Sequence, residues 1–265
     1  MMKLEEHFGL THPAFPKAAT ANTLLENPAL DHVLERLHFA LERDTIALLV
    51  AESGCGKSTA LYQFAKSLDA ASYNVVSICL TTLKPFSFLA HIVARLGLPR
   101  HCFKGECAAA ILAYLRSQPK RIVILIDEAH LLPDSCLEDL RLLSADNFDR
   151  DSPFSLVLVG QPILRERIAE PQHYALFQRI GVRLRLRPMN EQELALFLDR
   201  HMRAAGATKP IFEPAAAREI FHHSRGIPRL VQNVALEAML AAMSAQKHVV
   251  DAEAVQQAIV DSDAT

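Results

Sequence analysis

The sequence predicts an α/β protein in which a parallel sheet, covered on both faces by helices, is followed by a smaller all-helical region. Between residues 29 and 188, short apolar runs alternate with longer amphipathic segments, which is the pattern of repeated βαβ units. Several runs are apolar at consecutive positions, as expected for strands buried on both faces. After Pro188 the strand pattern stops and only helical spacing continues.

Composition bounds the class of protein. The chain has 265 residues, of which 50% are hydrophobic and 22% charged, and its formal net charge is −2. A chain of this length can bury roughly three quarters of its unfolded surface. This excludes a disordered tail, a disulfide mini-protein and a collagen-like repeat. The near-zero charge also argues against a histone-like DNA coat, although it leaves room for a local basic patch.

Cysteine usage and hydropathy favour a cytoplasmic protein. The number of cysteines is odd and no CxxC pair occurs, so we interpret all of them as reduced thiols. They are Cys55, Cys79, Cys102, Cys107 and Cys136. The first ten residues contain Glu5 and Glu6 without an apolar core, so no signal peptide is expected. No run approaches the roughly 18 apolar residues of a membrane span, so no membrane association is expected.

The first 28 residues are predicted to form an irregular arm. Pro13, Pro16 and Pro28 interrupt any long helix, and Phe8 and Phe15 are expected to dock on the body of the protein.

The next 160 or so residues should contain the sheet. Spacing predicts helix 29–43, strand 46–50, helix 57–68, strand 74–80, helices 85–96 and 106–116, strand 122–126, helix 136–145 and strand 154–159. In a last strand, Val182, Leu184 and Leu186 alternate with arginines, which indicates an edge strand with one face in water. Helices are then predicted over 191–205, 213–223, 228–245 and 251–262. The expected parts are therefore an arm (1–28), an α/β domain (29–188) and a helical domain (189–265).

The segment 51–58, Ala-Glu-Ser-Gly-Cys-Gly-Lys-Ser, lies between a predicted strand and a predicted helix, as a phosphate-binding P-loop does. Glycines let backbone N–H groups turn toward phosphate oxygens, and the helix N-terminus adds its dipole. Lys57 would supply charge to the β and γ phosphates, and Ser58 a hydroxyl to Mg²⁺. Ala51 replaces the usual first glycine. The alternative is a glycine-rich turn without a ligand. The predicted cradle comprises Ser53, Gly54, Cys55, Gly56, Lys57, Ser58 and Thr59.

Two carboxylates follow the buried strand 122–126. Asp127 would hold Mg²⁺ through water, and Glu128 would orient and deprotonate the attacking water. The alternative is a solvated acidic pair. Residues 127–130 also spell the helicase box Asp-Glu-Ala-His. Because a chain of this length cannot hold two motor cores of ~150 residues plus accessory elements, that spelling alone is weak evidence for a helicase.

Three further polar residues could complete a triphosphate site. Gln161 follows the strand 154–159 and could lie between the γ-phosphate and the water, or simply cap the strand. Arg179 precedes the edge strand and could project toward a neighbouring subunit's nucleotide, where such an arginine is worth roughly 10³–10⁵ in rate; the alternative is a surface salt bridge. Arg229 lies in the first turn of a helix after Gly226 and Pro228, and could reach the γ-phosphate or be an ordinary helix-start arginine.

In this order, these segments resemble the AAA+ ATPases of the ExeA-like group, which is similar to the transposition ATPases TnsC, TniB and MuB. The resemblance rests on the P-loop, 126–130, Val-Gly-Gln-Pro at 159–162, Gln-Arg-Ile at 178–180, Gly-Ile-Pro-Arg at 226–229 and the opening Phe-Gly-Leu at 8–10. It implies a sheet of order 5-1-4-3-2 with a helical lid, ATP and Mg²⁺ as cofactors, and a homo-oligomeric ring or helical filament. The implied roles are Walker A for Lys57 and Ser58, Walker B for Asp127 and Glu128, sensor 1 for Gln161, arginine finger for Arg179 and sensor 2 for Arg229.

The resemblance also suggests what the ATPase activity is for. ExeA proteins of secretion carry a membrane span and a cell-wall-binding region, and neither is expected here, which favours a protein that assembles on duplex DNA with ATP and recruits a transposase. The basic residues that would contact DNA follow the second strand: Lys84, Arg95, Arg100 and Lys104. The alternative is that these are ordinary solvated basic residues. A second basic patch, or a subunit interface, would comprise Arg183, Arg185 and Arg187. The alternatives are a nucleotide-gated scaffold for secretion or envelope partners, and a replication or helicase-loading ATPase.

Overall fold

A computed structural model describes residues 3–16, 28–145 and 152–263. The chain divides into two compact units. The α/β unit comprises Pro28–Ser53 and Lys57–Leu186. The helical unit comprises Arg187–Thr265, the stretch Met1–Asn27 and the three residues Gly54–Gly56.

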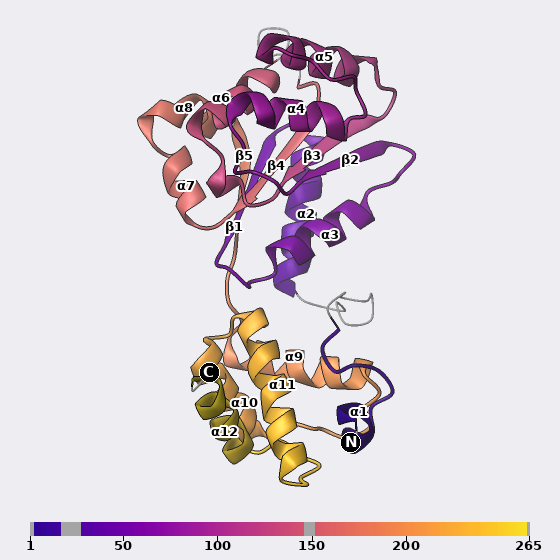
Figure 1. The fold of residues 1–265 in the computed structure, drawn as a ribbon, viewed down its shortest axis with the longest axis vertical. Helices are drawn as coiled ribbons and strands as arrows, with labels where there is room; N and C mark the ends of the chain where they lie inside the picture. The colour runs from indigo at the N-terminus through magenta and orange to yellow at the C-terminus, as the bar shows by residue number, and fades with distance from the viewer. Residues whose placement is uncertain (1–2, 17–27, 146–151, 264–265) are drawn as a thin grey trace. The chain divides into compact units, whose positions relative to one another are not determined.

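The α/β unit is built on a five-stranded parallel sheet (Figure 1). Its strands are β1 (Ile46–Ala51), β2 (Tyr73–Ile78), β3 (Arg121–Ile126), β4 (Ser155–Gly160) and β5 (Ile180–Leu186). Their order is β2-β3-β4-β1-β5, which is the predicted order 5-1-4-3-2 seen from the other side. The predicted fold class is therefore confirmed.

The register aligns the carboxyl ends of the central strands. Val50 pairs with Gly160, Leu158 pairs with Ile126, and Ile126 pairs with Ile78. The residues that follow these strands consequently meet at one edge of the sheet, where ligands bind in open α/β folds.

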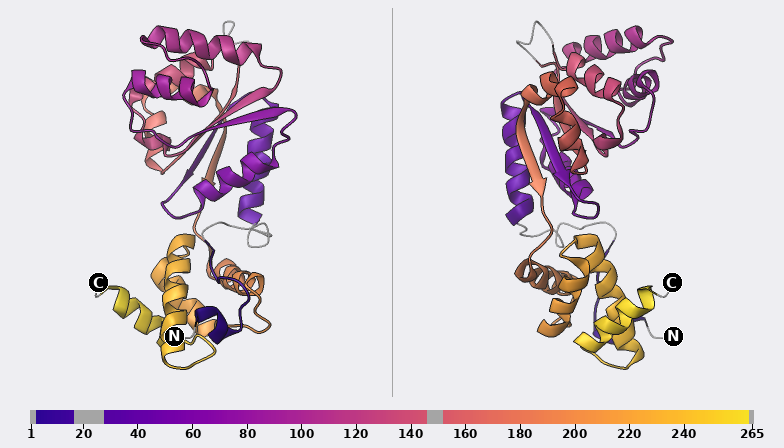
Figure 2. Two further views of the ribbon diagram at one scale, coloured as in Figure 1. Left: turned by 45° about the vertical axis from the view of Figure 1, so that its right-hand side comes forward. Right: turned by 90° about the vertical axis from the view of Figure 1, so that its left-hand side faces the viewer.

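Helices cover both faces of this sheet (Figure 2). One face is covered by α2 (Pro28–Glu42) and α3 (Lys57–Ser67). The other face is covered by α4 (Pro85–Arg95), α5 (Lys104–Ser117) and α6 (Asp134–Leu143). Because the central strands are buried on both faces, all residues of β1 and β4 are buried, as continuous apolar runs predict.

Four short elements of the α/β unit escaped prediction. They are α7 (Ile163–Ile168), α8 (Tyr174–Arg179) and the 3₁₀ turns η1 (Ala129–Leu131) and η3 (Pro171–His173). None exceeds six residues, so none shows a helical period, yet α7 and α8 bury apolar side chains in the core of the α/β unit.

The helical unit contains α9 (Glu191–Ala204), α10 (Pro214–Ser224), α11 (Pro228–Ser244) and α12 (Ala252–Asp263). Its core includes Leu198, Met202, Ile220, Val231 and Met239, each at most 2% exposed.

The N-terminal arm is packed on the helical unit. It was predicted to be irregular, and this was wrong for its start, because Leu4–Phe8 form the one-turn helix α1. Leu10 and Ala14 are buried in the helical core, with Phe8 and Phe15 packed against it. The backbone N–H groups of residues 11 and 12 both donate to the carbonyl oxygen of Ala205. The arm is therefore held by hydrogen bonds as well as by apolar burial.

No helix among the described residues is long and apolar enough to cross a membrane. All five cysteines are free thiols, three of them buried.

Candidate functional site

The P-loop segment connects β1 to α3 and bends at its glycines. Gly54 has φ +83° and Gly56 has φ +93°, in the left-handed region that disfavours any residue with a Cβ. Helix α3 begins directly afterwards at Lys57. The loop therefore has the two glycine turns and the helix N-terminus that a phosphate cradle requires.

Lys57 lies along this loop. Its side chain is nearly buried, and Nζ donates to the carbonyl oxygens of Ala51 at 3.0 Å and Glu52 at 3.1 Å. An ammonium group carries three N–H donors, and these bonds use two of them. The loop thus holds the charge in place with one donor left for a phosphate oxygen.

Ser58 and Asp127 join the start of α3 to the end of β3. Ser58 Oγ donates to Asp127 Oδ2 at 3.0 Å, although the two residues are 69 positions apart. Asp127 Oδ1 accepts the backbone N–H of Glu128 at 2.9 Å. A hydroxyl and a carboxylate side by side are the oxygen ligands that Mg²⁺ takes beside phosphate. Nowhere in the described ranges, this site included, do three or more His, Cys, Asp or Glu side chains gather to hold a metal by themselves.

Glu128 occupies a bend of the backbone. Its φ of +52° and ψ of +34° are left-handed, which is uncommon for a residue other than glycine. Thr81, only 2% exposed and just beyond β2, donates its Oγ1–H to the backbone oxygen of Glu128 at 3.0 Å. Such local strain persists only where surrounding contacts hold it, and it gathers at functional sites.

Gln161 and His130 lie beside this bend. Gln161 follows β4, and its backbone N–H lies 3.4 Å from His130 Nδ1. The same Nδ1 lies 3.4 Å from Glu128 Oε2. Neither His130 nor Thr81 was among the predicted site residues. His130 could have been found from the sequence, because residues 127–130 read Asp-Glu-Ala-His. The sequence around Thr81 contains no motif that would identify it.

Comparison with known proteins agrees with this geometry. Residues 40–168 match the family model described as an AAA domain. Cdc6p from Pyrobaculum aerophilum has a similar structure, with a TM-score of 0.73 at 17% identity over 96% of this chain and 70% of that one. The chain has the AAA+ P-loop fold.

Other similar proteins extend this comparison. The ORC1 protein of Aeropyrum pernix, in a complex with DNA, aligns with a TM-score of 0.65 at 18% identity over 93% of this chain and 66% of that one. General secretion pathway protein A from Aeromonas hydrophila is 31% identical over 251 residues, which are 92% of this chain and 45% of the relative. This likeness supports the ExeA-like part of the resemblance, and the chain spans less than half the length of that relative. The likeness to TnsC, TniB and MuB stays a prediction.

Within the AAA+ sheet, Arg179 lies far from the P-loop. It is the last residue of α8 and directly precedes β5, so it lies at the amino edge of the parallel sheet. Lys57 and Asp127 follow the carboxyl ends of β1 and β3, and a strand of this length spans roughly 20 Å. Arg179 Nη1 lies 3.3 Å from Ser144 Oγ, and partial burial lowers the pKa of its guanidinium. The α/β unit therefore does not bring Arg179 to its own P-loop.

Arg229 is exposed at the second position of α11 in the helical unit. Its sensor role stays a prediction.

The predicted DNA contacts lie at the ends of α4, at the start of α5 and in the loop between these helices. Lys84 precedes α4 and Arg95 ends it, so the length of the helix, about 16 Å, separates them. Arg100 is exposed in the loop after α4. Lys104 Nζ lies 2.7 Å from Asp139 Oδ1, so a carboxylate already balances its charge. Lys84, Arg95 and Arg100 are exposed, and of these Arg95 and Arg100 are neighbours, five residues apart along the chain.

The arginines of β5, and Arg187 directly after it, are partly engaged within the chain. Apolar residues of this strand are buried and the others exposed, as its alternation predicts. Arg183 stacks 3.9 Å above the ring of Phe177, and Arg187 pairs with Glu193 at 2.7 Å. This leaves Arg185 as the most available cation of the second basic patch.

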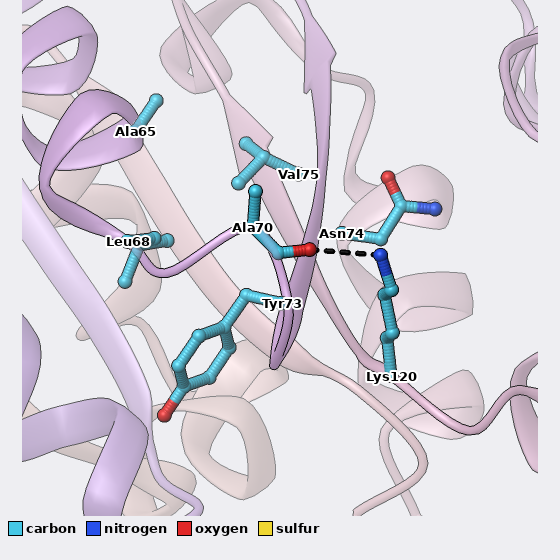
Figure 3. Close-up of a pocket in the computed structure, with 7 residues that line it drawn as sticks. All are labelled: Ala65, Leu68, Ala70, Tyr73, Asn74, Val75 and Lys120. Carbon is cyan, nitrogen blue, oxygen red and sulfur yellow. Dashed lines mark hydrogen bonds between the residues drawn. The ribbon is translucent and has the colours of Figure 1, made fainter.

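A separate hollow of about 460 Å³ lies beside the start of β2 (Figure 3). Tyr73, Asn74 and Val75 line it from the strand, and Lys120 closes one side by donating to the carbonyl oxygen of Ala70 at 2.8 Å. Because Tyr73 begins β2 and Lys120 precedes β3, the hollow is at the amino edge of the sheet. It contains no predicted site residue.

Proposed function

We propose that this protein binds ATP with Mg²⁺ at the carboxyl edge of the sheet and hydrolyses it. The observation that carries this proposal is the Ser58–Asp127 hydrogen bond beside Lys57. It brings two separate sequence motifs, the P-loop and the acidic strand end, within one ligand's reach. The backbone cradle, the ammonium group and the two oxygen-bearing side chains would then surround the β and γ phosphates.

Each residue has a distinct task in this proposal. The P-loop N–H groups and Lys57 would bind the phosphates, and Ser58 and Asp127 would hold the metal, Asp127 through a water molecule. Bound Mg²⁺ would neutralise charge on the phosphates. Glu128 orients the attacking water and takes its proton. Gln161 would orient the γ-phosphate and the water. Arg229 of the helical unit would bind the γ-phosphate as sensor 2.

Replacement of Glu128 tests the hydrolysis step. Glu128→Gln keeps the shape of the side chain but removes the base, so ATP should still bind while turnover falls by about 10²–10⁴. Steady-state phosphate release and ATP titration measure the two quantities separately. Wild-type turnover in this variant would remove Glu128 as the base.

We propose that Arg179 completes the site of a neighbouring copy in a homo-oligomer. Its position at the amino edge supports action in trans, since roughly 20 Å of sheet separates it from its own P-loop. Arg179→Ala and Glu128→Gln should each be nearly inactive. A mixture should regain activity, because the Glu128→Gln subunit lends its arginine to the intact carboxylate of the Arg179→Ala subunit.

The mixing experiment has clear contrary outcomes. Full activity of Arg179→Ala alone would mean that the arginine finger is another residue, Arg165 or Arg183. Mixed assemblies that form, as judged by light scattering, but regain no activity would argue against a site shared between subunits.

We propose that the assembled protein binds duplex DNA without sequence preference and recruits a transposase. Support comes from the exposed pair Arg95 and Arg100 and from the fold shared with a protein solved in a complex with DNA. Repeated along an oligomer, two cations per subunit would give a phosphate track whose affinity falls steeply with salt. Arg95→Ala with Arg100→Ala should weaken ATP-dependent binding to random duplexes and reduce the salt slope, whereas Lys104→Ala, already paired with Asp139, should change it little.

A nucleotide-gated scaffold for protein partners is the second candidate function. It is favoured by the 31% identity to a protein named for the general secretion pathway. Because the chain spans 45% of that relative, the lack of a membrane span in these residues does not separate the two functions. Random duplex DNA that fails to bind with a slowly hydrolysed ATP analogue, under conditions where the protein assembles, would favour the scaffold.

A further inference from the structure

His130 occupies a slot between the ends of two central strands. It follows β3 by four residues, its side chain is 9% exposed, and it packs beside the end of β4. Gly160 makes this approach possible, because a Cβ there would lie 3.1 Å from the backbone nitrogen and 3.3 Å from Nδ1 of His130. The imidazole therefore has a defined position next to the proposed catalytic base.

Arg167 fixes the backbone that carries this ring. From α7, its guanidinium donates to the carbonyl oxygens of His130 at 2.6 Å and Leu132 at 2.9 Å. Arg167 also pairs with Asp134, and that hydrogen bond lowers the pKa of the carboxyl group. One arginine thus ties the turn after β3 to the helix after β4.

Nδ1 of His130 faces two groups of opposite character. Both the carboxylate of Glu128 and the backbone N–H of Gln161 lie 3.4 Å from it. The carboxylate can only accept a hydrogen bond and the N–H can only donate one, so a single ring nitrogen serves one of them at a time. A proton on Nδ1 favours Glu128, and a lone pair favours Gln161.

We propose that His130 is a positioning residue that sets the carboxylate of Glu128 and links it to the segment beginning at Gln161. This inference rests on the proposed ATP hydrolysis. When the Gln161 segment shifts on contact with the γ-phosphate and withdraws its N–H, the single proton of the neutral ring moves from Nε2 to Nδ1 through solvent, and Nδ1 then donates to Glu128 and fixes the base; the return of the Gln161 N–H reverses the exchange and releases it. His130 takes no proton from the water; that proton goes to Glu128.

Three substitutions separate the position of the nitrogen from the bulk of the ring. Asn places a polar atom one bond from Cγ, where Nδ1 lies, whereas Gln places it farther out, near Nε2, and Ala provides none. His130→Asn should therefore keep kcat within about three-fold of wild type, and His130→Gln and His130→Ala should lower kcat about ten-fold or more. The KM for ATP should change little in all three, because the P-loop is intact.

A double-mutant cycle tests whether His130 acts through the carboxylate. In the Glu128→Gln background, His130→Ala should change the residual rate by less than about two-fold, because the group it positions is gone. His38 provides a matched control in the same unit, since its Nε2 bonds Ser67 Oγ at 2.8 Å between α2 and α3. His38→Ala should lower the melting temperature without lowering kcat.

The outcomes distinguish this inference from the function on which it rests. A wild-type protein that assembles but hydrolyses no ATP overturns both. Normal kcat in His130→Ala, or equal loss in His130→Asn and His130→Ala, overturns the inference alone. A ten-fold loss that persists in the Glu128→Gln background would show that His130 acts by another route.

Discussion

The helical unit and the P-loop site hold their charged side chains differently. In the helical unit, opposite charges pair with each other: Lys247 contacts Asp251 and Glu253 at 2.7 and 2.8 Å, which raises the pKa of its ammonium group, and Arg187 pairs with Glu193. In the described part of the α/β site, Lys57 is bonded to backbone carbonyls and Asp127 to a hydroxyl and a backbone N–H.

We interpret the paired charges of the helical unit as structural, and the charges of Lys57 and Asp127 as available to a ligand. Exposed ion pairs contribute little to stability, about 0–1 kcal/mol each, but each charge in such a pair is balanced by its partner. A charge that is bonded only to neutral groups is not balanced in this way, so it can still attract a phosphate or a metal ion. Substitutions at the α/β site should therefore remove function with little loss of stability, and those in the helical unit should do the reverse.

Lys57→Ala should give the largest functional effect. Loss of the ammonium group removes the charge that faces the β and γ phosphates, so ATP affinity should fall below detection in isothermal titration. The melting temperature without nucleotide should change little. Lys66→Ala is the control, because Lys66 is exposed near the end of the same helix over the ring of Tyr62. Unchanged ATP affinity in Lys57→Ala would overturn the P-loop assignment.

Gly226→Ala should give the largest loss of stability, in the helical unit. Gly226 has φ +73°, and a Cβ there would lie 1.9 Å from the carbonyl oxygen of Met189, whose N–H donates to the oxygen of Gly226 at 2.9 Å. The clash and the left-handed backbone should cost about 2–4 kcal/mol in urea unfolding. Gly105→Ala, at a helical position with open space around it, should be neutral or stabilising by about 0.5–1 kcal/mol. Equal losses of stability in Gly226→Ala and Gly105→Ala would contradict this explanation.

The sequence predicts the parts of the molecule that depend on local pattern. Apolar runs and helical periods are local, so the strands and the long helices were correct, whereas the correct sheet order came from the family resemblance. Lys57, Ser58, Asp127 and Glu128 were predicted to lie together because each follows a strand that must be central. The structure brings Ser58 and Asp127 into direct contact.

Other features depend on tertiary packing and carry no local signal. The slot that holds His130 exists because Gly160 on another strand lacks a Cβ, and the tight turn at Gly226 exists because Met189 approaches it. The pairing of Lys104 with Asp139 likewise needs two helices in contact, so spacing alone could not show that this cation is neutralised. Conversely, α1 was missed because one turn of helix has no period to detect.

Asn190→Ala should cost the helical unit about 1 kcal/mol. The side chain of Asn190 accepts the N–H of Glu193 at 2.8 Å, and Glu193 accepts the N–H of Asn190 at 2.8 Å, so the pair caps the start of α9 from both sides. Urea unfolding measures the loss, and ATP affinity should not change. Asn190→Ser, which can still cap, should recover most of the stability, and a cost equal to that of alanine would exclude capping as the cause.

Acid should loosen the helical unit through His201, with no effect at neutral pH. Burial lowers the pKa of this ring, whose centroid lies 4.0 Å from that of the tilted Phe197 ring and 5.3 Å from that of Phe15 in the arm. A lowered pKa means that the native state prefers the neutral ring, so its stability contribution is complete above the unfolded pKa of about 6.5 and is lost as the pH falls through the native value. The protection factors of the amides of Thr11 and His12, which bond Ala205, should therefore fall as the pH drops below about 6.5, once the observed rates are divided by the intrinsic rates at each pH. His201→Phe should abolish this acid dependence because the ring cannot be protonated, while the protection factors in the α/β core stay unchanged. The same loss of protection in His201→Phe would place the acid-sensitive group elsewhere in the helical unit.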